Sequence, residues 1–444
     1  MNTPICDFVK RYSESASVRL HMPGHKGSAF VGPEAFDITE IEGADVLYKA
    51  GGIIAESQRN AARLFETRKT LYSTEGSSLC IRAMLRLALG AGSGGGARPW
   101  VLAARNAHKA FLSACALLDL DVEWIYTDEG ILSCSFSADD VEGKITSRDE
   151  KPIAVFVTSP DYLGNICDIK SIARVCHKHN VLLLVDNAHG AYLKFLPMDT
   201  HPITMGADIC CDSAHKTLPV LTGGAYLHIS KNAPACLCDG AEQAMELFAS
   251  TSPSYLILQS LDRANAYLDE DYKDKLALLA DRMEGIKRRL SENGICTVGN
   301  EPIKLTLAPK SFGYTGQALA EYLMERGIVC EFADPDYCVM MITPEINEDD
   351  ISRLEHALLK LEARLPITSA APSLHNAERV MSIREAMLSD SREIDVCDAL
   401  GEVLASPSVS CPPAVSVLVC GERINASAIK CFEYYGIKQC RVVK

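Results

Sequence analysis

One lysine of this chain stands where its amine could act as a nucleophile. Lys216 lies in Ser213-Ala214-His215-Lys216, between a strand-like run that ends at Asp212 and a second apolar run from Leu221 to Ile229. A lysine that is desolvated, or placed near another cation, can lose its proton and condense with an aldehyde. A lysine in a loop is ordinarily a solvated charge, so this interpretation depends on the groups that the rest of the chain supplies.

Two further segments carry groups that a pyridoxal phosphate (PLP) site needs. Glu75-Gly76-Ser77-Ser78 stands between a strand and a helix, where backbone N–H groups and two hydroxyls can hold a phosphate. The alternative for this segment is an ordinary helix N-cap. Asp186 ends an apolar strand, and a carboxylate there can keep a pyridine nitrogen protonated so that the ring accepts electrons. The alternative is a helix cap or a salt bridge at the edge of the core.

His108, Ser213 and His215 complete this set of groups. His108 follows another strand and could stack on a cofactor ring or move protons, although a surface loop histidine is the alternative. Ser213 could reach the phosphate, and His215 is the neighbour of Lys216. Taken together, the residue types and their order along the chain indicate PLP chemistry.

The elements that must position these groups are strands and helices in alternation. Apolar runs without alternation, at Pro152 to Val157 and Val181 to Val185, are separated by helical stretches such as Ile169 to His179. This pattern predicts an α/β fold whose mostly parallel sheet is covered on both faces. Ligands of such sheets bind beyond the carboxyl ends of the strands. Polar clusters are expected at these ends at residues 74–78, 105–109, 159–162, 186–190 and 213–216.

The whole chain is expected to have four parts. They are an N-terminal arm (residues 1–45), a PLP-binding large domain (46–293), a small α/β domain (294–365) and a C-terminal domain (366–444). In the last part, two helical stretches are expected before Cys411-Pro412-Pro413 and a strand that ends in Gly421-Glu422.

The composition excludes several classes of protein. A net charge of -14 argues against nucleic-acid binding, and no apolar run is long enough to span a membrane. No secretory signal is visible at the N-terminus. The 18 cysteines lack zinc-site spacing, so we expect no metal and reduced thiols in a cytoplasmic protein.

The joint pattern resembles the bacterial ornithine/lysine/arginine decarboxylases, which are fold-type-I PLP enzymes, along nearly the whole chain. The chain resembles the short branch of that family, which lacks an N-terminal response-regulator-like wing. The resemblance is carried by the segments His21-Met22-Pro23-Gly24-His25-Lys26-Gly27, Asp37-Ile38-Thr39-Glu40-Ile41, Gly76-Ser77-Ser78, Arg105-Asn106-Ala107-His108-Lys109, Val185-Asp186-Asn187-Ala188-His189-Gly190-Ala191, Ser213-Ala214-His215-Lys216-Thr217-Leu218, Ser250-Thr251-Ser252-Pro253-Ser254-Tyr255 and Pro412-Pro413 with Gly421-Glu422.

The resemblance implies an aspartate aminotransferase-like large domain with a mostly parallel seven-stranded sheet. It implies that a basic L-amino acid (arginine, lysine or ornithine) loses CO2 to give an amine of polyamine biosynthesis. Lys216 would carry PLP as an imine, Asp186 would pair with the pyridine nitrogen, and His108 and Ala188 would cover the two ring faces. The proton returned to Cα would come from His215 or Lys216.

The resemblance also implies how the cofactor and the subunits are held. The phosphate would be bound by Gly76, Ser77, Ser78 and Ser213, with His215 beside the imine. Thr251 and Ser252 would come from a neighbouring subunit, so a homodimer would be the smallest working unit.

The chain departs from the family pattern at several positions. Asn187 stands where the family usually has Glu, Ala414 where it has Gly, and Ala44-Asp45-Val46 where it tends to have Leu-Asp-Asp. The distal cation of the substrate needs a carboxylate partner, for which Glu422 and Asp45 are the candidates.

Two alternatives to decarboxylation stay open at this point. Another fold-type-I activity, such as that of an aminotransferase or a lyase, is disfavoured because Arg326 is the only arginine between residues 300 and 345. A regulatory homologue without turnover is the second alternative, and the presence of Lys216, Asp186 and His108 argues against it.

Overall fold

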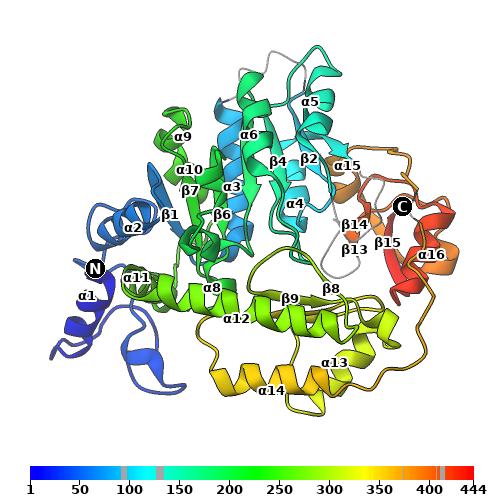
Figure 1. Cartoon of the computed structure of the whole chain (residues 1–444). Helices are drawn as coiled ribbons and strands as arrows, with labels where there is room; N and C mark the ends of the chain where they lie inside the picture. The colour runs from blue at the N-terminus through cyan, green and yellow to red at the C-terminus, as the bar shows by residue number, and fades with distance from the viewer. Residues whose placement is uncertain (92–97, 127–134, 374, 407, 411–415) are drawn as a thin grey trace. The chain divides into compact units, whose positions relative to one another are not determined.

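The computed structural model describes residues 1–91, 98–126, 135–373, 375–406, 408–410 and 416–444 (Figure 1). The chain forms two compact units. The first contains residues 1–96, 149–156 and 169–274, and the second contains residues 97–148, 157–168 and 275–444. The four-part division at residues 45, 293 and 365 stays a prediction. In the described ranges, none of the helices combines the length and the apolar character needed to cross a bilayer.

A seven-stranded sheet has the strand order β1-β7-β6-β5-β4-β2-β3. β2 pairs with β3 and β5 pairs with β6 in parallel, whereas β7 is antiparallel to both β1 and β6. Every residue of β2 and β7 is buried, so these strands show no alternation of apolar and polar residues. The predicted mostly parallel, seven-stranded sheet is confirmed. Its strands are Lys69–Ser73 (β1), Trp100–Ala104 (β2), Asp121–Ile125 (β3), Ala154–Thr158 (β4), Leu182–Asp186 (β5), Ile209–Asp212 (β6) and Ala225–Ile229 (β7).

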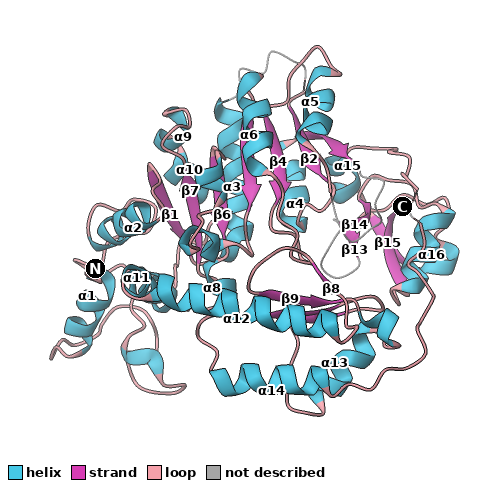
Figure 2. Cartoon of the chain, viewed as in Figure 1, coloured by secondary structure: helices cyan, strands magenta, loops and turns pink. Residues whose placement is uncertain are grey.

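Helix α3 (Gly76–Ala91) is the central helix of the first unit. It packs against β1, β5, β6 and β7 (Figure 2). Leu79, Met84 and Leu87 are among its buried residues, so most of its circumference is apolar. The other helices of this unit are α1 (Pro4–Ser13), α2 (Ile53–Leu64), α6 (Ile169–Lys178), α7 (Pro202–Met205), α8 (Ala214–Thr217), α9 (Cys236–Asp239), α10 (Ala241–Glu246) and α11 (Tyr255–Asp269).

The second unit contains a small antiparallel sheet of order β10-β11-β9-β8. Its strands are Thr297–Val298 (β8), Lys304–Leu307 (β9), Phe332–Ala333 (β10) and Cys338–Met341 (β11). The helices of this unit are α4 (Lys109–Leu118), α5 (Ala138–Thr146), α13 (Gly316–Met324), α14 (Glu348–Leu359), α15 (Ile383–Leu388) and α16 (Ala426–Tyr434), while α12 (Tyr272–Glu292) runs into it from the first unit. Short 3-10 turns cover Pro33–Ala35, Ala191–Phe195, Pro309–Phe312 and Val396–Asp398.

The C-terminal region differs from its prediction in the order of its elements. One helix, α15, precedes strand β12 (Ser391–Asp395), and α16 follows β14 (Ser416–Val419). β12 pairs with β15 (Gln439–Val443), and β13 (Ser408–Ser410) pairs with β14. β12 has no buried residue, so no apolar pattern marks it as a strand. Cys411-Pro412-Pro413 and Ala414 lie outside the described residues.

Candidate active site

Lys216 lies in a short connection between two antiparallel neighbours, β6 and β7. The connection begins with Ser213 and one helical turn, α8, and it is closed by a hydrogen bond from the His215 N–H to the Gly224 carbonyl at 3.1 Å. The Lys216 side chain is half-buried, and its Nζ is 3.1 Å from Nε2 of His189. The lysine is therefore held between the end of β6 and the loop that follows β5.

Asp186 is the last residue of β5 and is only 2% exposed. Its Oδ1 accepts hydrogen bonds from the Ala188 N–H at 3.2 Å and from the Cys211 thiol at 3.6 Å. These contacts fix the orientation of a buried carboxylate directly before the loop that carries His189. Ala188 is also buried, and its packing on a cofactor ring stays a prediction.

The predicted phosphate ligands Ser77 and Ser213 come together. The Ser213 hydroxyl donates to Oγ of Ser77 at 2.8 Å, although the two residues are 136 positions apart. Gly76 has a φ of +71°, and its N–H donates to the Gly223 carbonyl at 2.7 Å. At Gly223 an added Cβ would lie 2.8 Å from the carbonyl oxygen of Thr74, so only glycine fits there. The start of α3 thus presents hydroxyls at a helix N-terminus, where anions bind favourably.

The cofactor-binding roles of Ser78, Thr251 and Ser252 stay predictions. Ser78 follows Ser77 in the first turn of α3 and is half-buried. Thr251 and Ser252 are exposed, in a loop whose Ser250 N–H donates to Oε1 of Glu75 at 2.7 Å. Their predicted contribution to a neighbouring subunit stays a prediction.

His108 belongs to the second unit, and its stacking on a cofactor stays a prediction. Its Nδ1 accepts a hydrogen bond from the Ala110 N–H at 3.2 Å, so His108 caps α4. In the same loop, Arg105 donates to both carboxylate oxygens of Glu422 at 2.8 and 2.6 Å, and its guanidinium lies 5.1 Å from the Trp124 ring centroid. This buried pair fixes the loop that carries His108.

Both carboxylates that we predicted for the distal cation of the substrate already have structural partners. Glu422 is paired with Arg105 and also accepts the Val419 N–H at 2.9 Å. Asp45 accepts backbone N–H groups around the start of α2, among them those of Gly52 at 2.8 Å and Ile54 at 3.0 Å. These N–H groups hold the pKa of Asp45 below its ordinary value, although burial opposes the shift. Local donors thus engage both carboxylates, and their predicted role toward the distal cation stays a prediction.

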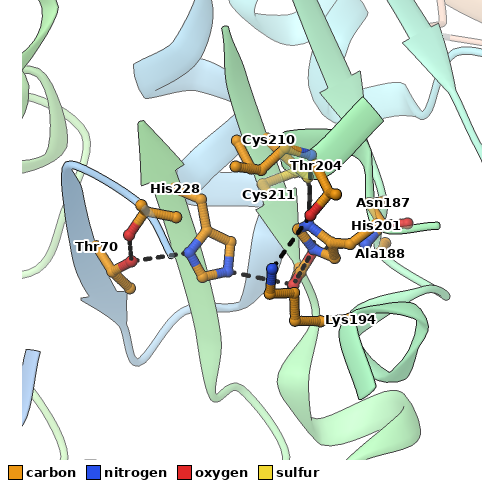
Figure 3. A network of polar contacts seen from close by, with 12 residues as sticks. Thr70, Asn187, Ala188, Lys194, His201, Thr204, Cys210, Cys211 and His228 are labelled. Atoms are coloured by element: carbon orange, nitrogen blue, oxygen red, sulfur yellow. Dashed lines mark hydrogen bonds and ion pairs between the residues drawn. The ribbon is translucent and has the colours of Figure 1, made fainter. Parts of the chain in front are cut away.

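A buried network that the sequence did not reveal lies behind Asp186. Asp212 accepts hydrogen bonds from Nδ2 of Asn187 at 2.7 Å, Nε2 of His201 at 3.0 Å and Nε2 of His228 at 3.2 Å. Figure 3 shows the two imidazoles, whose ring centroids are 5.6 Å apart, with Asn187 beside His201. Asn187, one of the departures from the family pattern, thus has a partner on the neighbouring strand.

The protonation of this network follows from its geometry. Burial alone would raise the pKa of Asp212, but the charges and N–H groups of His201 and His228 outweigh burial and hold it well below its ordinary value. Nδ1 of His201 accepts the Ile203 N–H at 3.3 Å, so its proton sits on Nε2 and points to Asp212. Burial lowers the pKa of His228. Asp212 is therefore a buried anion that hydrogen bonds stabilise.

The chain is similar to known proteins in its sequence and in its fold. Residues 3–298 match the family described as Orn/Lys/Arg decarboxylase, major domain. The arginine decarboxylase of Bacillus subtilis is 27% identical over 465 residues, which cover 96% of this chain and 92% of the relative. The crystal structure of the lysine decarboxylase of Francisella novicida superposes with a TM-score of 0.81 at 16% identity, covering 100% of this chain and 81% of that one. A structure described as SPT with PLP superposes with a TM-score of 0.56 at 13% identity over 71% of this chain and 79% of that one.

Proposed function

We propose that this chain, which belongs to the Orn/Lys/Arg decarboxylase family, uses PLP to remove the α-carboxylate of a basic L-amino acid. The observation that carries the proposal is the half-buried Lys216 amine, which lies 3.1 Å from His189 Nε2 and follows β6, the strand that pairs with the strand ending at Asp186. An amine in such a place can bind an aldehyde. The fold, which is that of fold-type-I PLP enzymes, supports the same cofactor.

The residues of the first unit fit this cofactor. The N-terminus of α3 with the hydroxyls of Ser77 and Ser213 suits a phosphate, and the fixed carboxylate of Asp186 suits a protonated ring nitrogen. When bound, PLP supplies an electron sink for the pair left behind by departing CO2. In this assignment, His189 orients the amine of Lys216 by accepting a hydrogen bond from it.

The proton that returns to Cα is assigned to Lys216. Nδ1 of His215 faces the Gly224 carbonyl at 3.0 Å, so this nitrogen must carry the hydrogen. Burial lowers the pKa of His215, which leaves its Nε2 without a proton at neutral pH. A neutral His215 can accept a proton but has none to give on Nε2. Of the two candidate donors, the Lys216 amine is therefore the better one.

Arginine is the first substrate to test. The relative from Bacillus subtilis is named an arginine decarboxylase, and lysine and ornithine complete the panel. Because Asp45 and Glu422 are engaged with backbone N–H groups and with Arg105, the carboxylate that binds the distal cation is assigned to neither residue.

Assembly into a homodimer is part of the same proposal. The arm exposes a series of large apolar side chains, which include Leu20 at 89% and Val31 at 90% exposure. A run of exposed apolar residues is typical of a surface that a second chain covers. Thr251 and Ser252, exposed in the same unit, would then complete the partner's site.

Absorbance and product analysis test this function. The purified protein should take up PLP with a new visible absorbance, and Lys216→Ala should lose the absorbance and turnover together. Lys231→Ala, which changes an exposed lysine of the same unit, should keep both. Chromatography should find CO2 and an amine, whereas a keto acid would indicate an aminotransferase. A wild-type protein that takes up no PLP would rule out the proposal.

A further inference from the structure

Two cysteines of the second unit have their sulfur atoms in contact. The thiol of Cys338 donates to Sγ of Cys330 across 3.4 Å. Cys338 is the first residue of β11 and is fully buried, whereas Cys330 precedes β10 and is half-buried. A disulfide has an S–S distance of about 2.0 Å, so the two sulfurs need to approach by only about 1.4 Å to be joined.

The two thiols differ in their access to small reagents. Cys330 lines a cavity of about 460 Å³, whose wall also includes Gly327, Glu331 and Arg353. Both sequence neighbours of Cys330, Val329 and Glu331, are exposed. A small oxidant can therefore reach Cys330 first, while Cys338 stays shielded behind it.

The thiol of Cys330 is also the more acidic of the two. Its sulfur accepts the hydrogen bond from Cys338, which lowers its pKa, and the same contact together with burial raises the pKa of Cys338. Burial raises the pKa of Cys176 and Cys420 to about 12. Because the thiolate is the reactive form, Cys330 is the better nucleophile. A reachable, acidic thiol next to a second thiol is the arrangement found at redox-sensing cysteines.

We propose that Cys330 and Cys338 are a reversible oxidation site, at which a peroxide closes an intramolecular disulfide. The Cys330 thiolate attacks one oxygen of hydrogen peroxide, so an S–O bond forms, the O–O bond breaks and hydroxide leaves. The sulfur of Cys338 then attacks the sulfur of Cys330, which forms the S–S bond and releases water. Two thiols and one peroxide thus give one disulfide and two waters, and a dithiol reductant reverses the change.

The packing around the pair determines which side moves when the disulfide closes. β11 is hydrogen-bonded to β9 and β10 on its two sides. The turn before it is packed against Gly316, where an added Cβ would lie 1.9 Å from the Tyr337 carbonyl oxygen. The movement must therefore come from the Cys330 side, next to Glu331, which accepts a hydrogen bond from the Tyr162 hydroxyl at 2.9 Å. Oxidation would act on the loop that follows β4 through this contact.

Peptide mapping of the full-length protein tests the proposal. The protein is purified reduced, treated with hydrogen peroxide, alkylated and digested with trypsin. Residues 327–353, released by cleavage after Arg326 and Arg353, contain Cys330 and Cys338 and no other cysteine. We expect this peptide to become lighter by two hydrogen atoms and to resist alkylation. After further cleavage at Glu331, its two pieces should stay joined until a dithiol is added. Oxidation of Met340 or Met341 would instead add oxygen.

Matched variants decide the order of the steps. Cys338→Ser should let Cys330 proceed to sulfenic and higher acids, and Cys330→Ser should leave Cys338 reduced. Cys296→Ser, at an exposed cysteine of the same unit, should not change the result. We expect the pair to react at least about tenfold faster than Cys296. Oxidation of Cys330 no faster than that of Cys296, or its linkage to any other cysteine, would overturn the proposal. Thermal unfolding of each reduced variant checks that it is folded.

Discussion

Replacing Asp212 by alanine should strongly destabilise the first unit, although its side chain is not among the predicted ligands of the cofactor. The substitution removes the acceptor shared by Asn187, His201 and His228. Their N–H groups would be left in a part of the core that water does not reach, since Asn187, His201 and His228 are all at 0% exposure. The loss of stability therefore comes from the unpaired N–H donors and not from the smaller volume of the alanine side chain.

The magnitude follows from the number of donors. An unpaired buried donor costs on the order of 1 to 3 kcal/mol, and breaking a buried charged pair costs about 3 to 5 kcal/mol. Three unpaired donors at the lower limit of this cost give about 3 kcal/mol, and the cost of a broken charged pair reaches about 5 kcal/mol. Asp212→Ala should lower the free energy of unfolding by about 3 to 5 kcal/mol. Asp212→Asn keeps the shape and one acceptor oxygen, so its loss should be smaller.

Urea unfolding followed by tryptophan fluorescence and by circular dichroism measures this change. Asp149→Asn is the matched control, because Asp149 is exposed and its change should stay within about 0.5 kcal/mol. Each protein is measured in its apo form, so that differences in cofactor uptake do not affect the comparison. An Asp212→Ala protein that unfolds within about 1 kcal/mol of the wild type would refute the claim that this anion holds the network together.

Three other predictions concern single contacts. Because burial lowers the pKa of His228 in the folded state, the unfolded chain binds more protons than the folded chain as the pH falls below about 6.5. The free energy of unfolding should therefore fall from pH 7 to pH 5, and it should fall less in His228→Gln. Thermal unfolding measured across this pH range tests both expectations. Arg105→Ala should leave Glu422 buried without its cation and cost about 3 to 5 kcal/mol; an unchanged unfolding midpoint of the substrate-free protein would contradict a stabilising role for this pair. Asp45→Ala should lower the free energy of unfolding by about 1 to 2 kcal/mol, because α2 loses its cap. The variant should turn over arginine, lysine and ornithine in the same order of preference as the wild type. A changed order of preference would contradict a purely structural role for Asp45.

The strands and the proximity of Ser77 to Ser213 were predictable because their signals are local. The apolar runs predicted at Pro152 to Val157 and Val181 to Val185 form the strands Ala154–Thr158 and Leu182–Asp186, within two residues of the predicted bounds. The rule that ligand groups gather at the carboxyl ends of parallel strands placed Ser77 and Ser213 near each other, and their hydroxyls are in contact. The contact of His189 with Lys216 was not predicted, although the adjacency of β5 and β6 brings the segments after these two strands together.

The features that the sequence did not predict depend on contacts between residues far apart in the chain, which no local sequence pattern indicates. Arg105 meets Glu422 across 317 positions, and neither residue looks different from a solvated charge in the sequence. His228 reaches Asp212 because of the antiparallel register that sets Cys210 opposite His228. A histidine on a buried strand and an aspartate at a strand end each have ordinary explanations alone. Only the three-dimensional fold shows that they are one network.

The position of Lys216 between two adjacent antiparallel strands has a consequence for how the chain folds. The β6–β7 hairpin closes within about twenty residues, so its loop-closure entropy is small and it can form early. The contact of Ser77 with Ser213 joins residues 136 positions apart and must wait for α3 to dock. In a nascent chain, the amine of Lys216 would thus reach its place before the hydroxyls of Ser77 and Ser213 meet. If the proposed function holds, tight binding of PLP would then mark the molecules whose first unit has finished folding.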